Sequence, residues 1–316
     1  MGWRVGPVTI SGTLLQPSSP PSGMGVAFAA GSGPTDRDWN SPLLPGENGG
    51  GKLLAAALAD AGIASVRYDK SASGPNALAN VTSLDGITMQ HHTDEFAGAV
   101  RALADEASVD RIVGLGNSEG TLHVLHYQLG DPAIPLAGLV LLAPPGRSVG
   151  AVARAQLAAQ AALVQEGEAL MALYDEAAAR FAHGEPVEPD PQLPEGMNLL
   201  LRSLESPLNL PFARELWLAD ASSLLARVDV PVLVVIGKKD VQVDWQDDGR
   251  LLQRAAAGRT NVVFAFPDDA NHVLKHEPRA RADLTGETAA ASYNTDDAEL
   301  DADATETVIE WLREHA

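Results

Sequence analysis

The chain has 316 residues and no cysteine, which excludes disulfides, thiol nucleophiles and Cys-ligated metal centres. Its 22 basic and 42 acidic residues give a net charge of −20, a field that repels nucleic-acid backbones and anionic lipid. We therefore expect no nucleic-acid partner and no membrane association. The hydrophobic content of 45% and the lack of an apolar signal core near the start predict a folded, cytoplasmic protein. The oligomeric state stays open.

The acidic balance itself has two interpretations. Only five of the basic residues are lysines, and alanine is abundant. This composition fits an adaptation to salt, which screens self-repulsion. It fits equally a coding bias towards alanine and arginine, and the sequence does not separate the two.

Short apolar runs alternate with longer helical patterns along the chain. The middle runs are continuous in Val, Ile and Leu, which indicates strands buried on both faces of a parallel sheet. Alternating βα units predict an α/β fold with a mostly parallel, doubly wound sheet. The expected strands are Val8–Leu15, Met24–Ala29, Ser65–Tyr68, Arg111–Leu115, Gly138–Leu142, Val232–Ile236 and Val262–Phe266. The expected helices are Lys52–Ala61, Asp94–Glu106, Glu119–Leu129, Asp247–Ala257 and Ala304–Arg313.

Two segments break this alternation. Residues 146–211 contain no strand signal; the Ala-rich stretch Val149–Ala182 predicts one or two helices, and Met197–Leu204 is expected to form another. We interpret them as a helical cap inserted into one core domain made of residues 1–145 and 212–316. The second segment, Glu277–Ala302, is acidic and is expected to be a surface loop.

The segment Gly116–Gly120 reads Gly-Asn-Ser-Glu-Gly and has the form Gly-x-Ser-x-Gly. Alone this is weak, because chance gives about 0.15 such matches in a chain of this composition. Its context is stronger, since it follows a strand and opens a helix, as a nucleophile elbow does. The segment therefore predicts Ser118 as a nucleophile. The alternative is a glycine-rich loop with an N-capping serine.

A serine hydroxyl needs a base to remove its proton, and the chain has eight histidines. His272 follows the last predicted strand, on a loop at the carboxyl edge of the sheet, and is the expected base; His276 is the second choice. His91 and His92 are expected to face solvent. His123 and His126 could bind a metal as an i, i+3 pair, but no carboxylate motif accompanies them, so we expect packing or surface roles and no metal.

The base in turn needs a carboxylate that orients it. Asp240 directly follows the predicted strand Val232–Ile236, and the order Ser118, Asp240, His272 is that of an α/β-hydrolase triad. Three further acids near this strand are lower-ranked alternatives, because they lie beyond the strand end or at a helix start: Asp244, Asp247 and Asp248.

An acyl-transfer site also needs two N–H donors for the developing oxyanion. The residue after the nucleophile, Glu119, supplies one, and Ser32 in the glycine-rich loop after Met24–Ala29 is the candidate for the other. This loop could instead bind phosphate. It lacks the spacing of known phosphate-binding loops, however, and the chain's charge opposes such a ligand.

Several motifs together resemble one subgroup of bacterial α/β-hydrolase carboxylesterases. The similar segments are Gly31-Ser32-Gly33-Pro34-Thr35-Asp36-Arg37-Asp38, Arg67-Tyr68-Asp69-Lys70, Ser118-Glu119-Gly120, Asp240-Val241-Gln242-Val243 and Asn271-His272-Val273-Leu274-Lys275. The resemblance covers most of the chain. It implies an α/β-hydrolase fold and hydrolysis of short acyl esters through Ser118, Asp240 and His272, without a cofactor.

The chain departs from that subgroup at three places. Trp39 stands where a glycine usually follows Asp38, and we expect it to make the loop's rim bulkier. Asn117 stands where histidine is common, and Ser71-Ala72-Ser73-Gly74 replaces the common Arg-Gly. Four charged residues are expected to form a structural ion-pair network near the loop, with a role in placing Ser32 as the alternative: Asp36, Arg37, Asp38 and Lys70.

The sequence thus predicts a serine carboxylesterase that acts on a small-molecule ester. A thioesterase, a lactonase or an aminopeptidase could use the same triad; an aminopeptidase would want acids in the cap, where Glu166, Glu168 and Glu176 are available. A non-catalytic binding protein of the same fold is the third interpretation, although such proteins usually lack a triad member. The natural substrate, its acyl length and the cap residues that would line the pocket are not predicted.

Overall fold

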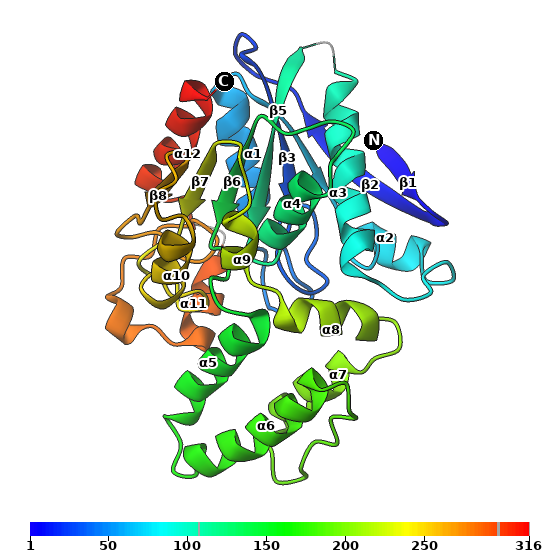
Figure 1. The fold of residues 1–316 in the computed structure, drawn as a ribbon. Helices are drawn as coiled ribbons and strands as arrows, with labels where there is room; N and C mark the ends of the chain where they lie inside the picture. The colour runs from blue at the N-terminus through cyan, green and yellow to red at the C-terminus, as the bar shows by residue number, and fades with distance from the viewer. Residues whose placement is uncertain (107, 296–297, 316) are drawn as a thin grey trace.

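The computed structural model describes residues 1–106, 108–295 and 298–315. Eight strands form one sheet in the order β1-β2-β4-β3-β5-β6-β7-β8 (Figure 1). Six neighbouring strands are parallel: β4, β3, β5, β6, β7 and β8. At the edge, β2 runs antiparallel to both β1 and β4. This confirms the predicted doubly wound, mostly parallel sheet.

All seven predicted strands are present within two residues of their expected bounds. They are β2 (Val8–Leu15), β3 (Gly23–Ala29), β4 (Ala64–Tyr68), β5 (Val109–Asn117), β6 (Gly138–Leu142), β7 (Val232–Val235) and β8 (Val262–Ala265). The sequence analysis missed β1 (Gly2–Val5), a four-residue edge strand paired with β2. Its residues are all exposed or half-buried, so it carries no continuous apolar run.

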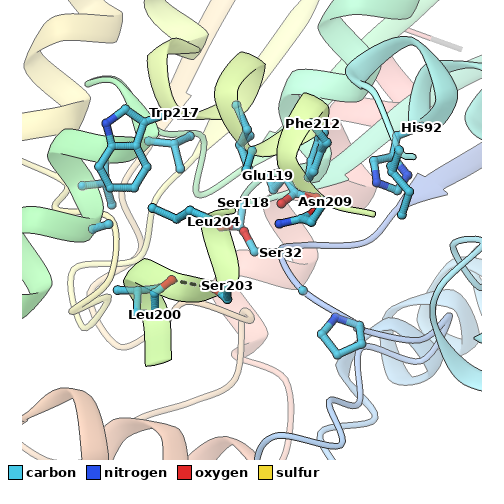
Figure 2. Close-up of a pocket in the computed structure, with 18 of the residues that line it drawn as sticks. Ser32, His92, Ser118, Glu119, Leu200, Ser203, Leu204, Asn209, Phe212 and Trp217 are labelled. Carbon is cyan, nitrogen blue, oxygen red and sulfur yellow. Dashed lines mark hydrogen bonds between the residues drawn. The ribbon is translucent and has the colours of Figure 1, made fainter. Parts of the chain in front are cut away.

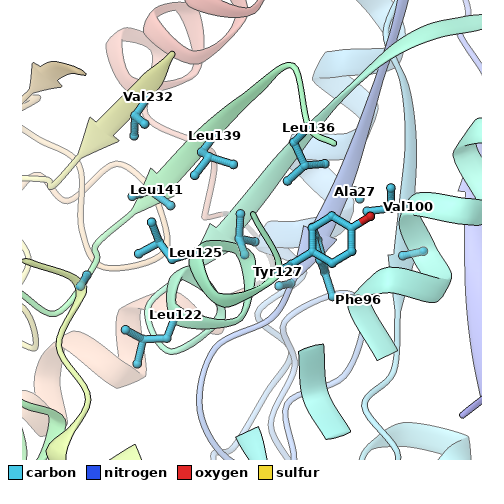
Figure 3. Close-up of a cluster of buried hydrophobic side chains, with 14 of the residues drawn as sticks. Ala27, Phe96, Val100, Leu122, Leu125, Tyr127, Leu136, Leu139, Leu141 and Val232 are labelled. Atoms are coloured by element: carbon cyan, nitrogen blue, oxygen red, sulfur yellow. The ribbon is translucent and has the colours of Figure 1, made fainter. Parts of the chain in front are cut away.

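Helices cover both faces of the sheet. One face packs against α3 (Met89–Ala104), α4 (Gly120–Leu129), α9 (Ala221–Leu225) and α10 (Asp247–Ala255). Figure 3 shows part of this core, where Leu122 and Leu125 of α4 lie over Leu139 and Leu141 of β6. The other face packs against α1 (Gly50–Asp60), α11 (Gly286–Tyr293) and α12 (Ala302–Glu314). A short α2 (Gly74–Ala79) follows β4.

The inserted helices follow β6 in the chain and lie beyond the carboxyl ends of the parallel strands (Figure 1). They are α5 (Val149–Ala161), α6 (Gly167–Ala182), α7 (Glu195–Leu204) and α8 (Leu210–Leu218). They bury an apolar cluster of their own, in which Tyr174 and Phe181 of α6 meet Leu201 of α7 and Trp217 of α8. Helix α8 starts at the predicted end of the insertion and contacts both the other inserted helices and α3.

The segment Glu277–Ala302 differs from the loop that we expected. It contains a 3₁₀ turn (Arg281–Asp283) and α11, whose Tyr293 is buried in the core. Glu277 is buried as well, and its carboxylate accepts hydrogen bonds from Arg279 and Ser292. The acidic composition therefore indicated exposure where ion pairs and capping bonds instead hold the segment against the core. Residues 296 and 297 of this segment lie outside the described residues. None of the helices in the described ranges combines the length and apolarity needed to cross a membrane.

Candidate active site

The predicted nucleophile lies on a sharp turn between β5 and α4. Ser118 has a φ of 53°, in the left-handed region that a residue with a side chain adopts at a cost, and its N–H donates to the Leu142 carbonyl at 2.8 Å. Two glycines make this turn possible. A Cβ on Gly116 would lie 2.5 Å from the backbone of Gly120, and one on Gly120 would lie 2.2 Å from the Ala29 carbonyl oxygen.

Asp240 and His272 lie on loops that follow β7 and β8, and they are hydrogen-bonded. Nδ1 of His272 lies 2.8 Å from Oδ2 of Asp240, and both side chains are buried. The other carboxylate oxygen of Asp240 accepts the backbone N–H groups of Gln242 and Val243. These bonds fix the carboxylate, and the carboxylate fixes the orientation of the imidazole.

A side chain next to the nucleophile connects the elbow to the histidine loop. Nδ2 of Asn117 donates to the backbone carbonyl of His272 at 3.1 Å. Ser118 Oγ itself has no hydrogen-bond partner among the described residues, His272 included. Hydrogen bonds to a general base are often long or unformed without substrate, so this arrangement is compatible with proton transfer once a substrate is bound.

The lower-ranked candidates have other partners. His276 is half-exposed and lies beside Asp301, which caps α12. Asp248 pairs with Arg147, and Asp244 pairs with Arg281 and caps the start of α10. None of these carboxylates contacts His272, so the geometry favours Asp240 among the acids.

The loop after β3 lies against the nucleophile. A Cβ on Gly31 would lie 3.5 Å from the Cβ of Ser118, and the next residue, Ser32, lines the same cavity as Ser118 and Glu119. The backbone N–H groups of Ser32 and Glu119 donate no hydrogen bond within the part of the chain that the structure describes. Two uncommitted donors beside a serine hydroxyl are what an oxyanion needs.

The cavity around Ser118 has a volume of about 570 Å³ and lies between the sheet and the inserted helices. Figure 2 shows Ser118, Glu119 and Ser32 facing Asn209, Phe212 and Leu204 of the insertion. Most of the lining is apolar, and the insertion supplies much of it. The inserted residues that line it include Val149, Val152, Leu200, Leu204, Leu208, Phe212, Leu216 and Trp217.

One of the two histidines that we expected to face solvent, His92, lines this cavity, and the other, His91, shares its carboxylate partner. Both lie on α3, and His92 is buried. His92 Nδ1 lies 2.8 Å from the carboxylate of Glu95, His91 Nε2 lies 3.2 Å from it, and the N–H of Ser71 donates to it at 2.7 Å. Burial raises the pKa of Glu95, but the two imidazoles outweigh burial and hold that pKa well below its usual range. A buried Glu three and four residues from two histidines was the signal that sequence reasoning missed.

The charged residues near the loop pair differently from the expected network. Arg37 pairs with Asp69, Arg67 pairs with Asp38, and Asp36 accepts hydrogen bonds from its own loop. The fourth, Lys70, bonds instead to Glu119, beside the nucleophile. The ionic contacts therefore divide into two groups. Those of Arg37 and Asp38 join the loop to β4 and the residue after it, whereas that of Lys70 reaches Glu119, next to Ser118.

Trp39 is not on the rim of the loop, as we expected, but in the core. Its side chain is only 4% exposed and packs beside Phe28, with a ring-centroid distance of 6.3 Å. Two glycines at the start of α1, Gly50 and Gly51, leave the space that the indole fills. Its φ of 70° lies in the left-handed region, which explains why a glycine is the more usual residue there.

The arrangement can support acyl transfer by a serine. It has a hydroxyl on a strained turn, an imidazole oriented by a carboxylate and two free N–H donors beside an apolar cavity. Within residues 1–106, 108–295 and 298–315, no three His, Asp or Glu side chains are grouped so that they could hold a metal ion.

Comparison with known proteins identifies the family of the chain. The profile of the "Alpha/beta hydrolase family" matches residues 26–284. The chain is similar to esterase EstD of Thermotoga maritima, with 26% identity over 261 residues; the match covers 79% of this chain and 54% of that protein, so the chain spans about half the length of this relative.

Solved structures share the fold. A proline iminopeptidase of Mycobacterium smegmatis superposes with a TM-score of 0.58 and 16% identity, over 100% of this chain and 98% of the other. A thermophilic esterase of Thermogutta terrifontis superposes with a TM-score of 0.54 and 17% identity, over 98% of this chain and 94% of the other. At such identities the likeness concerns the fold alone. The profile match over most of the chain shows more: this chain belongs to the alpha/beta hydrolase family.

Proposed function

We propose that the protein is a serine carboxylesterase that acts on small-molecule esters. The observation that carries this proposal is the buried hydrogen bond between Asp240 and His272 beside the elbow. The His272 carbonyl accepts a hydrogen bond from Asn117, the residue before Ser118, whose φ is left-handed. An imidazole held by a carboxylate beside a strained serine is the arrangement that activates a hydroxyl for attack on a carbonyl.

In the proposed mechanism Ser118 Oγ attacks the ester carbonyl while His272 Nε2 takes its proton. Asp240 keeps the tautomer in which Nδ1 carries the hydrogen, and it stabilises the imidazolium that forms. The N–H groups of Ser32 and Glu119 hold the oxyanion of the tetrahedral intermediate. His272 then gives its proton to the leaving alcohol, and water repeats the sequence to release the acid and free Ser118.

We further propose that α5–α8 act as the cap that selects the acyl group. The cavity wall that faces Ser118 comes from these helices and is largely apolar. A hydrocarbon acyl chain would replace water there without leaving polar groups unpaired, whereas a charged acyl group would lose its hydration. The cavity, at about 570 Å³, has room for a small-molecule ester.

An aminopeptidase is the second candidate, because a proline iminopeptidase has a similar fold. Recognition of a free amino group would require acids in the cap that face the cavity. Glu166, Glu168 and Glu176 are all exposed, and none lines the cavity around Ser118. This placement favours the esterase over the aminopeptidase.

A series of p-nitrophenyl esters from acetate upward tests the proposal, with intact-mass detection of a fluorophosphonate adduct. Turnover with a single adduct on Ser118, both lost in Ser118→Ala, is expected. Labelling of Ser118 without ester turnover would redirect the search to thioesters, lactones and amino-acyl amides. Turnover that survives in Ser118→Ala would contradict the proposed nucleophile, and absence of both would leave a binding protein of this fold.

A further inference from the structure

Lys70 is a buried cation that the proposed mechanism does not use. It follows β4 and is 4% exposed. Its ammonium group donates to the Gly31 carbonyl at 2.7 Å and lies 3.2 Å from the Glu119 carboxylate. One side chain therefore contacts the two segments that supply the proposed oxyanion donors, although they are about 90 residues apart.

The contact with Gly31 has a direct consequence for Ser32. The Gly31 carbonyl and the Ser32 N–H belong to one peptide unit, which is trans, since the described chain contains no cis peptide bond. In a trans peptide the C=O and N–H point in opposite directions. By holding the carbonyl oxygen on its own side, Lys70 turns the Ser32 N–H away from itself, and this N–H has no hydrogen-bond partner among the residues that the structure describes.

The contact with Glu119 acts on the second donor. The Glu119 carboxylate is buried between Lys70 Nζ and His123 Nε2, each 3.2 Å away. Burial raises the pKa of Glu119, but Lys70 and His123 outweigh it and keep that pKa well below its usual range. The side chain is thus fixed as an anion, which restricts the backbone at the residue that follows the nucleophile.

We infer that Lys70 is a positioning residue for the oxyanion hole, which aims the Ser32 N–H directly and fixes the Glu119 N–H through its carboxylate. This inference rests on the proposed esterase mechanism. A donor that is pre-oriented stabilises the transition state without reorganisation during the reaction, whereas the neutral carbonyl of the bound substrate gains much less. The effect of Lys70 should therefore appear in kcat rather than in KM.

The test compares Lys70→Met with the wild type on p-nitrophenyl acetate. Because the substitution leaves the Glu119 carboxylate buried without its cation, a second variant, Lys70→Met/Glu119→Gln, removes both charges and protects the fold. Arg259→Met is the matched control. Arg259 also donates to backbone carbonyls, those of Ala226 and Val228, but it lies away from the cavity.

Both Lys70 variants should lose about 100-fold in kcat, with KM changed less than about threefold, since losing an oxyanion donor costs a factor of this size. The affinity for a trifluoromethyl ketone, which forms a tetrahedral adduct with serine, should fall by a similar factor. Arg259→Met should lose stability but retain kcat per folded molecule. A double variant with wild-type kcat, or an unchanged trifluoromethyl ketone affinity, would overturn the inference.

The two proposals fail in different ways. A wild-type protein that neither labels with fluorophosphonate nor hydrolyses the ester would refute the esterase itself. A wild-type protein that does both, alongside a fully active Lys70→Met, would refute only the role of Lys70.

Discussion

The side chain of Asn117 donates a hydrogen bond to the backbone carbonyl of His272 at 3.1 Å. The residue before the nucleophile is thus bonded to the residue proposed as its base, although β6, the inserted helices, β7 and β8 separate them in the chain. This bond sets how closely the histidine loop approaches the elbow, independently of the Asp240 contact that orients the imidazole ring.

Replacing Asn117 with alanine should therefore lower kcat by about tenfold, because a lost hydrogen bond of 1–1.5 kcal/mol frees the loop that carries the base. KM should change little, since Asn117 does not line the cavity. Steady-state kinetics on p-nitrophenyl acetate would measure both. Asn261→Ala, which removes bonds to the Val228 and Val230 carbonyls far from the site, should change stability only; equal kcat in the two variants would contradict the prediction.

Replacing Asp240 with asparagine should lower kcat by about 10⁴, the loss that the same change causes in serine proteases, where the imidazole adopts the wrong tautomer. Asp244→Asn is the matched control, because Asp244 pairs with Arg281 and has no contact with His272. It should retain most activity. The reverse ranking of the two variants, measured as initial rates, would assign the orienting role to Asp244.

Trp39→Gly should destabilise the protein despite relieving a left-handed residue. Losing a buried aromatic side chain costs about 3–5 kcal/mol, whereas relief of the left-handed φ returns about 1–2 kcal/mol. The net loss in the free energy of unfolding, measured by urea titration, should be about 1–4 kcal/mol. Leu44→Ala, at an exposed position of the same loop, should have little effect. A glycine variant as stable as the wild type would show that strain at Trp39 cancels its packing.

Acidification should weaken the fold through His123. Burial lowers the pKa of this histidine from 6.5 to about 4. Between these values the unfolded chain binds more protons than the folded one, so stability falls as the pH decreases through this window. From pH 7 to pH 5 the loss should be on the order of 2 kcal/mol.

The comparison that isolates this effect is His123→Gln. Glutamine keeps an N–H donor for the Glu119 carboxylate and removes the titrating ring. Urea unfolding at the two pH values should show a smaller loss in this variant than in the wild type. A loss of the same size in both proteins would place the pH dependence on other groups, such as Glu95 with its two histidines.

The sequence predicted those features that depend on local pattern. Continuous apolar runs located β2 to β8, and the Gly-x-Ser-x-Gly turn located Ser118 at the end of β5. The candidate acid and base, Asp240 and His272, followed from chain order and from their places after β7 and β8. Parallel strands bring their carboxyl ends to one edge, so residues that are distant in sequence could be placed together without knowing any contact.

What could not be predicted depends on side chains that meet across the fold. His92 appeared exposed because it precedes the predicted helix Asp94–Glu106, yet it lies within α3, where it bonds to Glu95 and packs against Phe212. The side chain of Trp39 appeared to lie on the rim of its loop, because the space that receives it in the core is made by glycines of α1 and leaves no signal near Trp39 in the sequence. Lys70 appeared to belong with Asp36 and Asp38 of the loop after β3, but its carboxylate partner is Glu119. Only the pairing of β3 with both β4 and β5 brings Glu119 near Lys70.

The inserted helices bury an apolar cluster of their own, separate from the two clusters on the faces of the sheet. Mutations that reshape α6 and α7 therefore leave the turns that carry Ser118, Asp240 and His272 untouched. Changes in α6 and α7 can therefore alter the ligand while the turns below keep their geometry. The same separation makes these two helices, rather than α5 and α8, which also pack on the core, a natural unit for exchange in protein engineering.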